Sequence, residues 1–161
     1  MIDLVNSENY IRAHRRETIE TMLKFATTDL LLFWSDNKKI YARQQKIWQP
    51  FLNDYQKKYS VEIKISLNLA IPENEQCFLC LKKELENLSD RELTAVFLTA
   101  TKVKSVLLGL SILSGKSADD IINAAFLEDL YQNEIWGFDT EAIEKRKQIK
   151  EEIILIKDWI K

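Results

Sequence analysis

Residues 101–115 read Thr-Lys-Val-Lys-Ser-Val-Leu-Leu-Gly-Leu-Ser-Ile-Leu-Ser-Gly, and this apolar stretch decides how the rest of the chain can fold. Thr101, Ser105 and Gly109 recur every four residues, which places small side chains on one face of a helix. We therefore expect one helix over about residues 90–114, with a second helix packed closely against its small residues. The apolar run is far shorter than the ~20 residues that a bilayer-spanning helix needs, so no membrane insertion is expected.

The remainder of the sequence is also typical of a helical protein. Only three glycines and two prolines occur, too few for the many turns of a sandwich or barrel. Apolar spacing predicts an amphipathic helix after Ser7, a helix that ends near Trp48, and a fresh helix that Pro50 opens. Further helices are expected at 73–87, 118–136 and 140–160.

Two short segments have the pattern of β-strands. Residues 29–34 are apolar and end in a Ser-Asp-Asn cluster, and residues 61–67 alternate between apolar and polar side chains. Helices separate the two segments, so the strands could pair in parallel as in a crossover unit. The predicted fold class is α+β and predominantly α-helical: a helical bundle with a very small two-stranded sheet element, in a single domain over residues 1–161.

Composition and charge exclude several functions. The 161 residues carry a net charge of −2, which offers no general attraction for nucleic acid. The first residues resemble neither a secretory signal nor an arginine-rich transit peptide, and two cysteines fit a reducing compartment, so a cytoplasmic protein is expected. Cys77 and Cys80 have the spacing of a metal or redox pair, but His14 is the only histidine, and we expect these cysteines to pack in the core.

The most unusual segment is acidic. Residues 117–144 contain eight Asp or Glu and no Lys or Arg. Three interpretations remain open for the expected helix end at 128–137: a solvated face, a contact with a partner protein, or a catalytic carboxylate pair formed by Glu128 and Glu134. Acids near the C-terminal end of a helix oppose its macrodipole, which argues against purely incidental surface charge.

Glu134 is a special case among these acids, because helical spacing places it on the apolar side of its helix. A carboxylate in that position needs a cation, for which Lys102 and Lys104 on the preceding helix are candidates. We find no serine or cysteine nucleophile motif, glycine-rich phosphate loop or H-E-x-x-H motif in the sequence, so no catalytic residue, metal or cofactor is predicted.

Four blocks of the sequence together resemble a known family, the ATP-twelve assembly chaperones of the catalytic head of ATP synthase. Their order and spacing agree with the family over about residues 3–160. The blocks are Thr28-Asp29-Leu30-Leu31; a glutamine, tryptophan and proline at Gln45, Trp48 and Pro50; Lys104-Ser105 with Gly115-Lys116 after an apolar run; and Leu127-Glu128-Asp129-Leu130-Tyr131-Gln132-Asn133-Glu134-Ile135-Trp136-Gly137.

The resemblance implies a chaperone that binds the free α subunit of ATP synthase until the β subunit replaces it, without cofactor. It implies that the conserved-looking blocks are structural and that the acidic helix end contacts the partner. The residues expected to make that contact are Glu128, Asp129, Gln132, Glu134 and Trp136, with Gly137 shaping the helix end. Eukaryotic relatives would act in the mitochondrial matrix.

The sequence also departs from the family. Phe126 stands in place of an arginine, Leu130 in place of an acid, and Gln49 in place of an aspartate. Family members carry an N-terminal β-rich domain ahead of the helical one, so we expect this chain to correspond to the C-terminal helical domain alone, without the β-rich domain, and a separately encoded chain could supply that domain. The alternatives are a helical interaction module with a different client and, less favoured, a small enzyme that uses Glu128 and Glu134.

Overall fold

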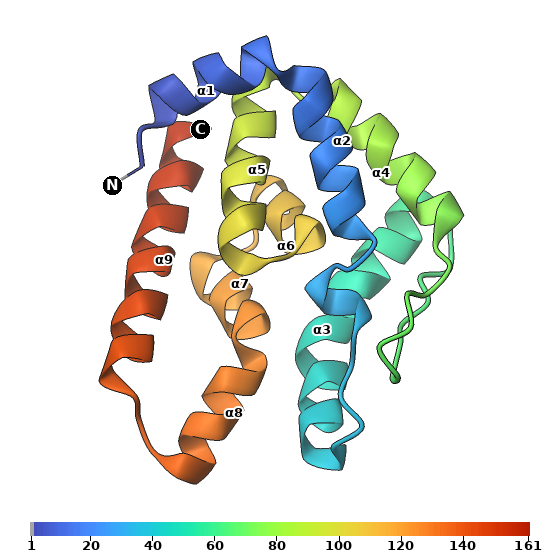
Figure 1. Cartoon of the computed structure of the whole chain (residues 1–161), viewed down its shortest axis with the longest axis vertical. Coiled ribbons are helices and arrows are strands. Elements are labelled where there is room, and N and C mark those ends of the chain that lie inside the picture. The colour runs from blue at the N-terminus through green and yellow to red at the C-terminus, as the bar shows by residue number, and fades with distance from the viewer. Residues whose placement is uncertain (1) are drawn as a thin grey trace.

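The computed structural model describes residues 2–161, which form an assembly of helices around a continuous apolar core (Figure 1). Nine α-helices and two 3-10 helices follow one another in this part of the chain: α1 (Leu4–Ala13), α2 (Arg15–Ala26), η1 (Leu30–Leu32), α3 (Lys38–Tyr59), α4 (Glu75–Asn87), α5 (Asp90–Val103), α6 (Val106–Leu110), η2 (Ser111–Ser114), α7 (Ala118–Ala125), α8 (Leu127–Trp136) and α9 (Thr140–Trp159).

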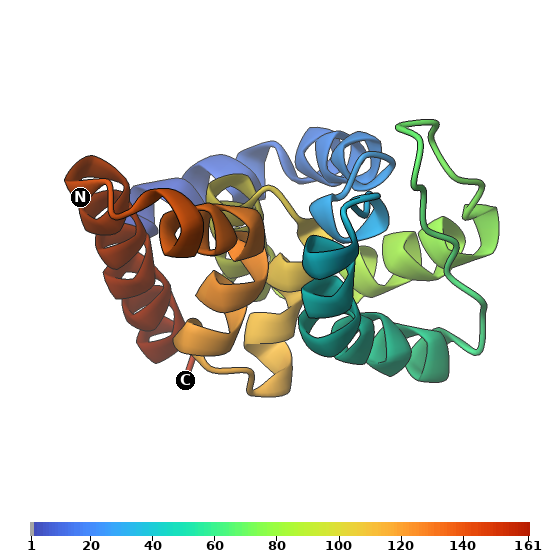
Figure 2. The ribbon, with the colours of Figure 1, turned by 90° about the horizontal axis from the view of Figure 1, so that it is seen from below.

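Helices α5 and α6 occupy the middle of the molecule, and the other helices pack around them (Figure 1). Helix α1 crosses the upper ends of α5 and α9, and α2 lies between the central pair and α4. Seen from below, α9 lies at one end of the molecule, and α4 lies with the extended segment before it at the other (Figure 2). Helix α8 lies at the lower edge of the molecule in this view, where a short turn joins it to α9 (Figure 1).

The expected single helix over residues 90–114 is wrong, because the chain leaves the helix at Lys104. This residue has φ 58° and ψ 35°, the left-handed conformation, and it ends α5. Ser105 then caps α6, its hydroxyl accepting a hydrogen bond from the Leu108 amide at 3.0 Å. Helix α6 folds back against α5, so the close approach expected at Gly109 occurs between two halves of the predicted helix.

The buried carboxylate of Asp29 holds this break in place. It accepts hydrogen bonds from the Ser105 hydroxyl at 2.6 Å and from the Leu107 amide at 3.1 Å, both at the start of α6. It also accepts one from the Leu31 amide at 3.0 Å, which caps η1. Burial raises the pKa of Asp29, and the hydrogen bonds from these three donors oppose that rise.

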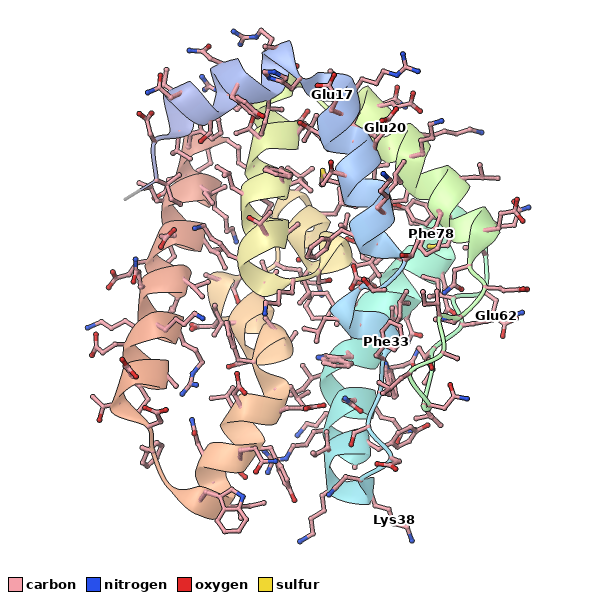
Figure 3. All side chains as sticks on the ribbon, in the orientation of Figure 1. Glu17, Glu20, Phe33, Lys38, Glu62 and Phe78 are labelled. Carbon is pink, nitrogen blue, oxygen red and sulfur yellow. The ribbon has the colours of Figure 1, made fainter. Side chains whose placement is uncertain are left out.

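The predicted two-stranded sheet is also wrong, since the described residues contain no β-strand. Residues 30–32 form η1 instead, and the only strand-like pairing in the described chain is an isolated parallel bridge between Phe33 and Ser66. Figure 3 shows Phe33 beside the extended segment that follows α3. The prediction that the protein is predominantly helical is confirmed.

Side chains take the place of strand partners along the extended segment. The Ile63 amide donates to the Gln56 side chain at 2.8 Å. The Asn74 carboxamide bonds both backbone groups of Lys64, accepting from its amide at 2.7 Å and donating to its carbonyl at 2.9 Å. These backbone groups of Ile63 and Lys64 are thus satisfied without a sheet, which an alternating sequence pattern cannot reveal.

Other boundaries differ in the same way. Helix α3 runs through Pro50 without ending there, and the expected helix at 118–136 breaks at Phe126 into α7 and α8. The cap of the first helix is Asp3 and not Ser7. The last predicted helix agrees with α9 to within one residue at its C-terminal end.

Gly109→Ala should destabilise the protein. An added Cβ would lie 2.8 Å from the Val96 carbonyl oxygen and 3.0 Å from the Ala100 Cβ, so α6 must move away from α5. We expect a loss of about 1–3 kcal/mol in urea unfolding followed by circular dichroism. Helix propensity alone predicts the opposite sign, because alanine is favoured over glycine by about 0.5–1 kcal/mol. A stabilised variant would therefore contradict the close packing of these helices.

Asp29→Asn should lower the free energy of unfolding by about 1–3 kcal/mol, because an amide group would face the backbone and hydroxyl donors that now meet a carboxylate. Asp139→Asn is the matched control, since Asp139 caps α9 at the surface and asparagine caps equally well. Equal losses at both positions would contradict a special role for Asp29.

The same pair of variants tests the pH dependence. Because burial raises the native pKa of Asp29 above its ordinary value of 3.8, folding takes up a proton between the two values. The stability that this proton contributes is present below pH 3.8 and is lost as the pH rises through the native pKa. The advantage of the wild type over Asp29→Asn should therefore shrink as the pH rises from acid. An advantage that grows over that range would contradict the raised pKa.

Candidate functional site

Helix α8 carries most of the residues expected to contact a partner, and its two ends are sharply defined. Phe126 separates it from α7, and Gly137 ends it with φ 92°, a conformation that favours glycine. The Gly137 amide still donates to the Asn133 carbonyl at 3.0 Å. Two residues later Asp139 caps α9 by accepting from the Glu141 amide at 3.0 Å. The chain therefore reverses within a short turn.

Glu128, Asp129 and Gln132 are all exposed, and neither carboxylate forms an ion pair with any residue that the structure describes. The break at Phe126 changes the electrostatic argument for these acids. It places Glu128 and Asp129 in the first turn of α8 and not near the end of a longer helix. Acids are favourable there, so the expected conflict with the macrodipole is wrong for these two residues.

Glu134 has a different partner from the one expected. Both of its carboxylate oxygens are bonded by the guanidinium of Arg43 on α3, with an Nη1 to Oε1 distance of 3.0 Å. Arg43 also stacks over the ring of Tyr131, 4.9 Å from its centroid. Lys102 instead pairs with Glu152 of α9. The arginine fork thus joins α8 to α3.

The pairing with Arg43 also bears on the catalytic alternative. Hydrogen bonding to Arg43 lowers the pKa of Glu134, so this carboxylate is ionised and already bonded at neutral pH. A general acid needs a raised pKa and a free position beside its substrate. The proposed pair of Glu128 and Glu134 therefore gains no support from the geometry.

An apolar cluster stands out at the lower end of α8. Trp136 is 81% exposed and Phe138 is 83% exposed, and Ile135 between the acids and the tryptophan is 51% exposed. We call Ile135, Trp136 and Phe138 the apolar tip. Only Trp136 was expected from the sequence. Phe138 follows the glycine that ends the helix, and an aromatic residue in an acidic turn was the available signal.

The other motif residues lie in the interior or on α3. Trp48 is buried, and its indole Nε1 donates to the Ala124 carbonyl at the end of α7 at 2.7 Å. Pro50 and Gln45 are exposed on α3, whereas Gln44 is fully buried and accepts from the Ser35 amide at 2.9 Å. Sequence reasoning chose Gln45 and missed Gln44, although Gln44 lies one turn before Trp48 on the same face.

Asp29, Lys104 and Ser105 belong to the break between α5 and α6, described above, and do not reach the surface of α8. The expected cysteine positions are partly as predicted: Cys77 is buried, which raises its pKa to about 11, and Cys80 is half-buried. Residues 2–161 contain no group of three His, Cys, Asp or Glu side chains that could hold a metal ion. None of the described helices has both the length and the apolar character required to cross a bilayer.

Comparison with solved structures identifies the fold. Atp12 from Paracoccus denitrificans superposes with a TM-score of 0.84 over 92% of this chain, at 20% sequence identity. The chain has the Atp12 fold. A single-residue variant of the same Paracoccus protein gives a TM-score of 0.85. A protein from Agrobacterium tumefaciens gives 0.82 over 91% of this chain, also at 20% identity.

The match to the Atp12 structures does not extend over their whole length. This chain spans 65% of the Paracoccus Atp12 chain and 56% of the Agrobacterium chain. No family model matches the sequence, and no curated protein matches it. The likeness is therefore one of three-dimensional structure, and it covers nearly all of the chain described here.

Trp48→Phe should destabilise the protein by about 1–3 kcal/mol, because the buried Ala124 carbonyl loses its hydrogen-bond donor. Trp136→Phe is the same substitution at a tryptophan that is 81% exposed, and its effect should stay within about 0.5 kcal/mol. Urea unfolding followed by far-ultraviolet circular dichroism measures both. A large effect at Trp136 would show that the apolar tip is part of the core.

Proposed function

We propose that this protein is an assembly chaperone of the catalytic head of ATP synthase, which binds the free α subunit until the β subunit takes its place. Three observations support the proposal. The fold is that of Atp12, and one of the similar structures is described as a candidate chaperone. Each of the four sequence blocks that resemble the ATP-twelve family includes a buried residue, namely Asp29, Trp48, Ser105 and Leu127, and the last block forms α8. The surface of α8 has the chemistry of a protein interface.

The observation that carries the proposal is the apolar tip at the C-terminal end of the helix whose first turn holds two carboxylates without ion pairs. Trp136 and Phe138 each expose more than four fifths of their surface, although large aromatic side chains are usually well buried. Contiguous exposed apolar groups with polar neighbours mark interaction sites, and tryptophan is enriched among residues that dominate binding energy. A helix end that only contacts water gives no reason for two exposed aromatic side chains.

The carboxylates would contribute in another way. Glu128 and Asp129 are exposed and free of cations within the described chain, so they can meet basic or amide groups of a client. Such contacts favour fast association and correct orientation more than high affinity. A chaperone that must yield to the β subunit benefits from that balance, because the client has to be released without an energy source.

The surface is also held in shape before any client arrives. The bidentate Arg43–Glu134 pair fixes α8 against α3, and Gly137 and Asp139 fix the turn that carries Phe138. Preorganisation reduces the entropy lost on binding. We assign Glu134 and Gly137 to shaping the surface, and Glu128, Asp129, Gln132 and Trp136 to contact with the α subunit.

The experiment that tests the proposal is a pull-down with the α and β subunits of the same organism's ATP synthase, expressed separately. Retention of α but not of β supports the proposal. Retention of both or of neither contradicts it for this chain. A second pull-down with a separately encoded β-rich domain tests whether such a domain acts with this chain, which we infer corresponds to the helical domain of the family.

Glu128→Lys should weaken binding of the α subunit at least tenfold while leaving the helical spectrum unchanged. Glu17→Lys is the matched control: it makes the same charge change at an exposed carboxylate on the upper end of α2 (Figure 3), whereas α8 lies at the lower edge (Figure 1). Isothermal titration calorimetry measures both affinities. Equal weakening by the two variants would mean that net charge, and not the α8 surface, governs binding.

A further inference from the structure

A groove of about 340 Å³ lies on α8 and is bounded by α3, α7 and α9. Its apolar lining comes from two helices and the turn after α8: Ile47 belongs to α3, Leu127 and Leu130 belong to α8, and Phe138 of the apolar tip lies in the turn. The volume lies at the lower end of the range typical for binding pockets, which suits one apolar side chain with a polar group. The groove adjoins the apolar tip. Its polar lining includes Asn133 and Arg146 and does not include the exposed acids Glu128 and Asp129.

Two residues of the groove carry donors without a partner, one accessible and one buried. Arg146 of α9 is half-buried in the lining and forms no ion pair with any residue of the described chain. The side-chain amide nitrogen of Asn133 is buried and has no hydrogen-bond partner within that same part of the protein. Both groups are donors that ordinarily find acceptors when they lose contact with water.

The single carboxylate in the lining does not balance these donors. Glu134 is bonded through both oxygens to Arg43, so that pair is close to neutral. Of the two arginines in the lining, Arg146 is therefore the one without an ion-pair partner among the described residues. A free inorganic anion would gain little from Ile47, Leu127 and Leu130, whereas a carboxylate next to an aliphatic or aromatic group would satisfy both halves of the groove.

We propose that this groove binds an apolar residue that carries or adjoins a carboxylate, supplied by the client segment that contacts α8. Arg146 bonds the carboxylate, and the apolar side chain lies on Leu127 and Leu130. The inference rests on the proposed chaperone function and deepens it. Helix α8 then recognises opposite charges on its two sides, which fixes the orientation of the client as a single acidic face could not.

The groove itself is tested with small probes that need no client. N-acetyl-leucine and N-acetyl-leucinamide share the apolar group and differ in the carboxylate, and their binding can be followed by ¹⁵N-resolved NMR of the folded protein. We expect N-acetyl-leucine to shift the Asn133 side-chain amide and the Arg146 Nε–H resonances, with the amide probe at least tenfold weaker. Equal binding of the two probes, or no shift at either group, overturns the proposal.

A variant identifies the recognising cation. Arg146→Gln should remove the preference for N-acetyl-leucine, while Arg16→Gln, a change at a highly exposed arginine of α2, should keep it. The helical spectrum and the urea midpoint of both variants show that the fold is intact. A preference that survives Arg146→Gln assigns the probe to another site and overturns the role of the groove.

Binding of the α subunit tests the proposed client separately from the proposed ligand of the groove. If the groove prefers the carboxylate probe but α is not retained, the proposed client is wrong and the groove stands. If α is retained and the probes are not distinguished, the client stands and the groove is overturned. Where both hold, Arg146→Gln should weaken α binding at least tenfold, and an unchanged affinity would remove the groove from the client contact.

Discussion

The architecture depends on one buried carboxylate. Asp29 lies far along the chain from Ser105 and Leu107, yet it bonds both, and it caps the short 3-10 turn beside it. An ionisable group with no exposed surface is costly unless donors surround it, and here three donors converge on two oxygens. The break between α5 and α6 is the geometry in which that convergence is possible. Without it, the most apolar stretch of the chain would continue outward as one helix and leave much of its surface in water.

The reversal at Lys104 sets the positions of the later helices. Helix α6 packs back against α5, with Gly109 close to Val96 and Ala100, and α7 and α8 follow it along the chain. Trp48 then joins α3 to the end of α7, and Arg43 joins α3 to α8. The surface at α8 is consequently built on three successive tertiary contacts. Its rigidity comes from the interior, although its functional groups lie at the edge.

Sequence reasoning predicted where helices exist but not where they stop. Local propensity favours continuing a helix through Lys104 and Phe126, and the contacts that favour the breaks come from distant residues such as Asp29. The supposed strands failed for a related reason: Gln56 and Asn74 bond the extended segment in place of a neighbouring strand. Periodic patterns of apolar residues in a sequence indicate which residues are buried. The side-chain hydrogen bonds described above produce no such periodic pattern.

The residues of the candidate site also fall into two groups: those that local helical spacing places and those that depend on contacts between helices. Glu128, Asp129, Gln132 and Trp136 could be placed on the surface from helical spacing, because exposure is a local property of an amphipathic helix. The partner of Glu134 could not, since Arg43 lies on another helix and was never a candidate. The groove donors were missed as well, because Arg146 and Asn133 come together only through the turn that reverses α8 into α9.

The position of the acids within α8 decides how strongly they indicate a binding surface. In the first turn of α8, Glu128 and Asp129 interact favourably with the helix dipole and so stabilise the helix. Their presence is therefore explained without any partner. Exposed aromatic groups have no such local explanation, because burying them would release free energy. The case for a binding surface therefore rests on Trp136 and Phe138, and the acids and the groove describe what kind of partner that surface fits.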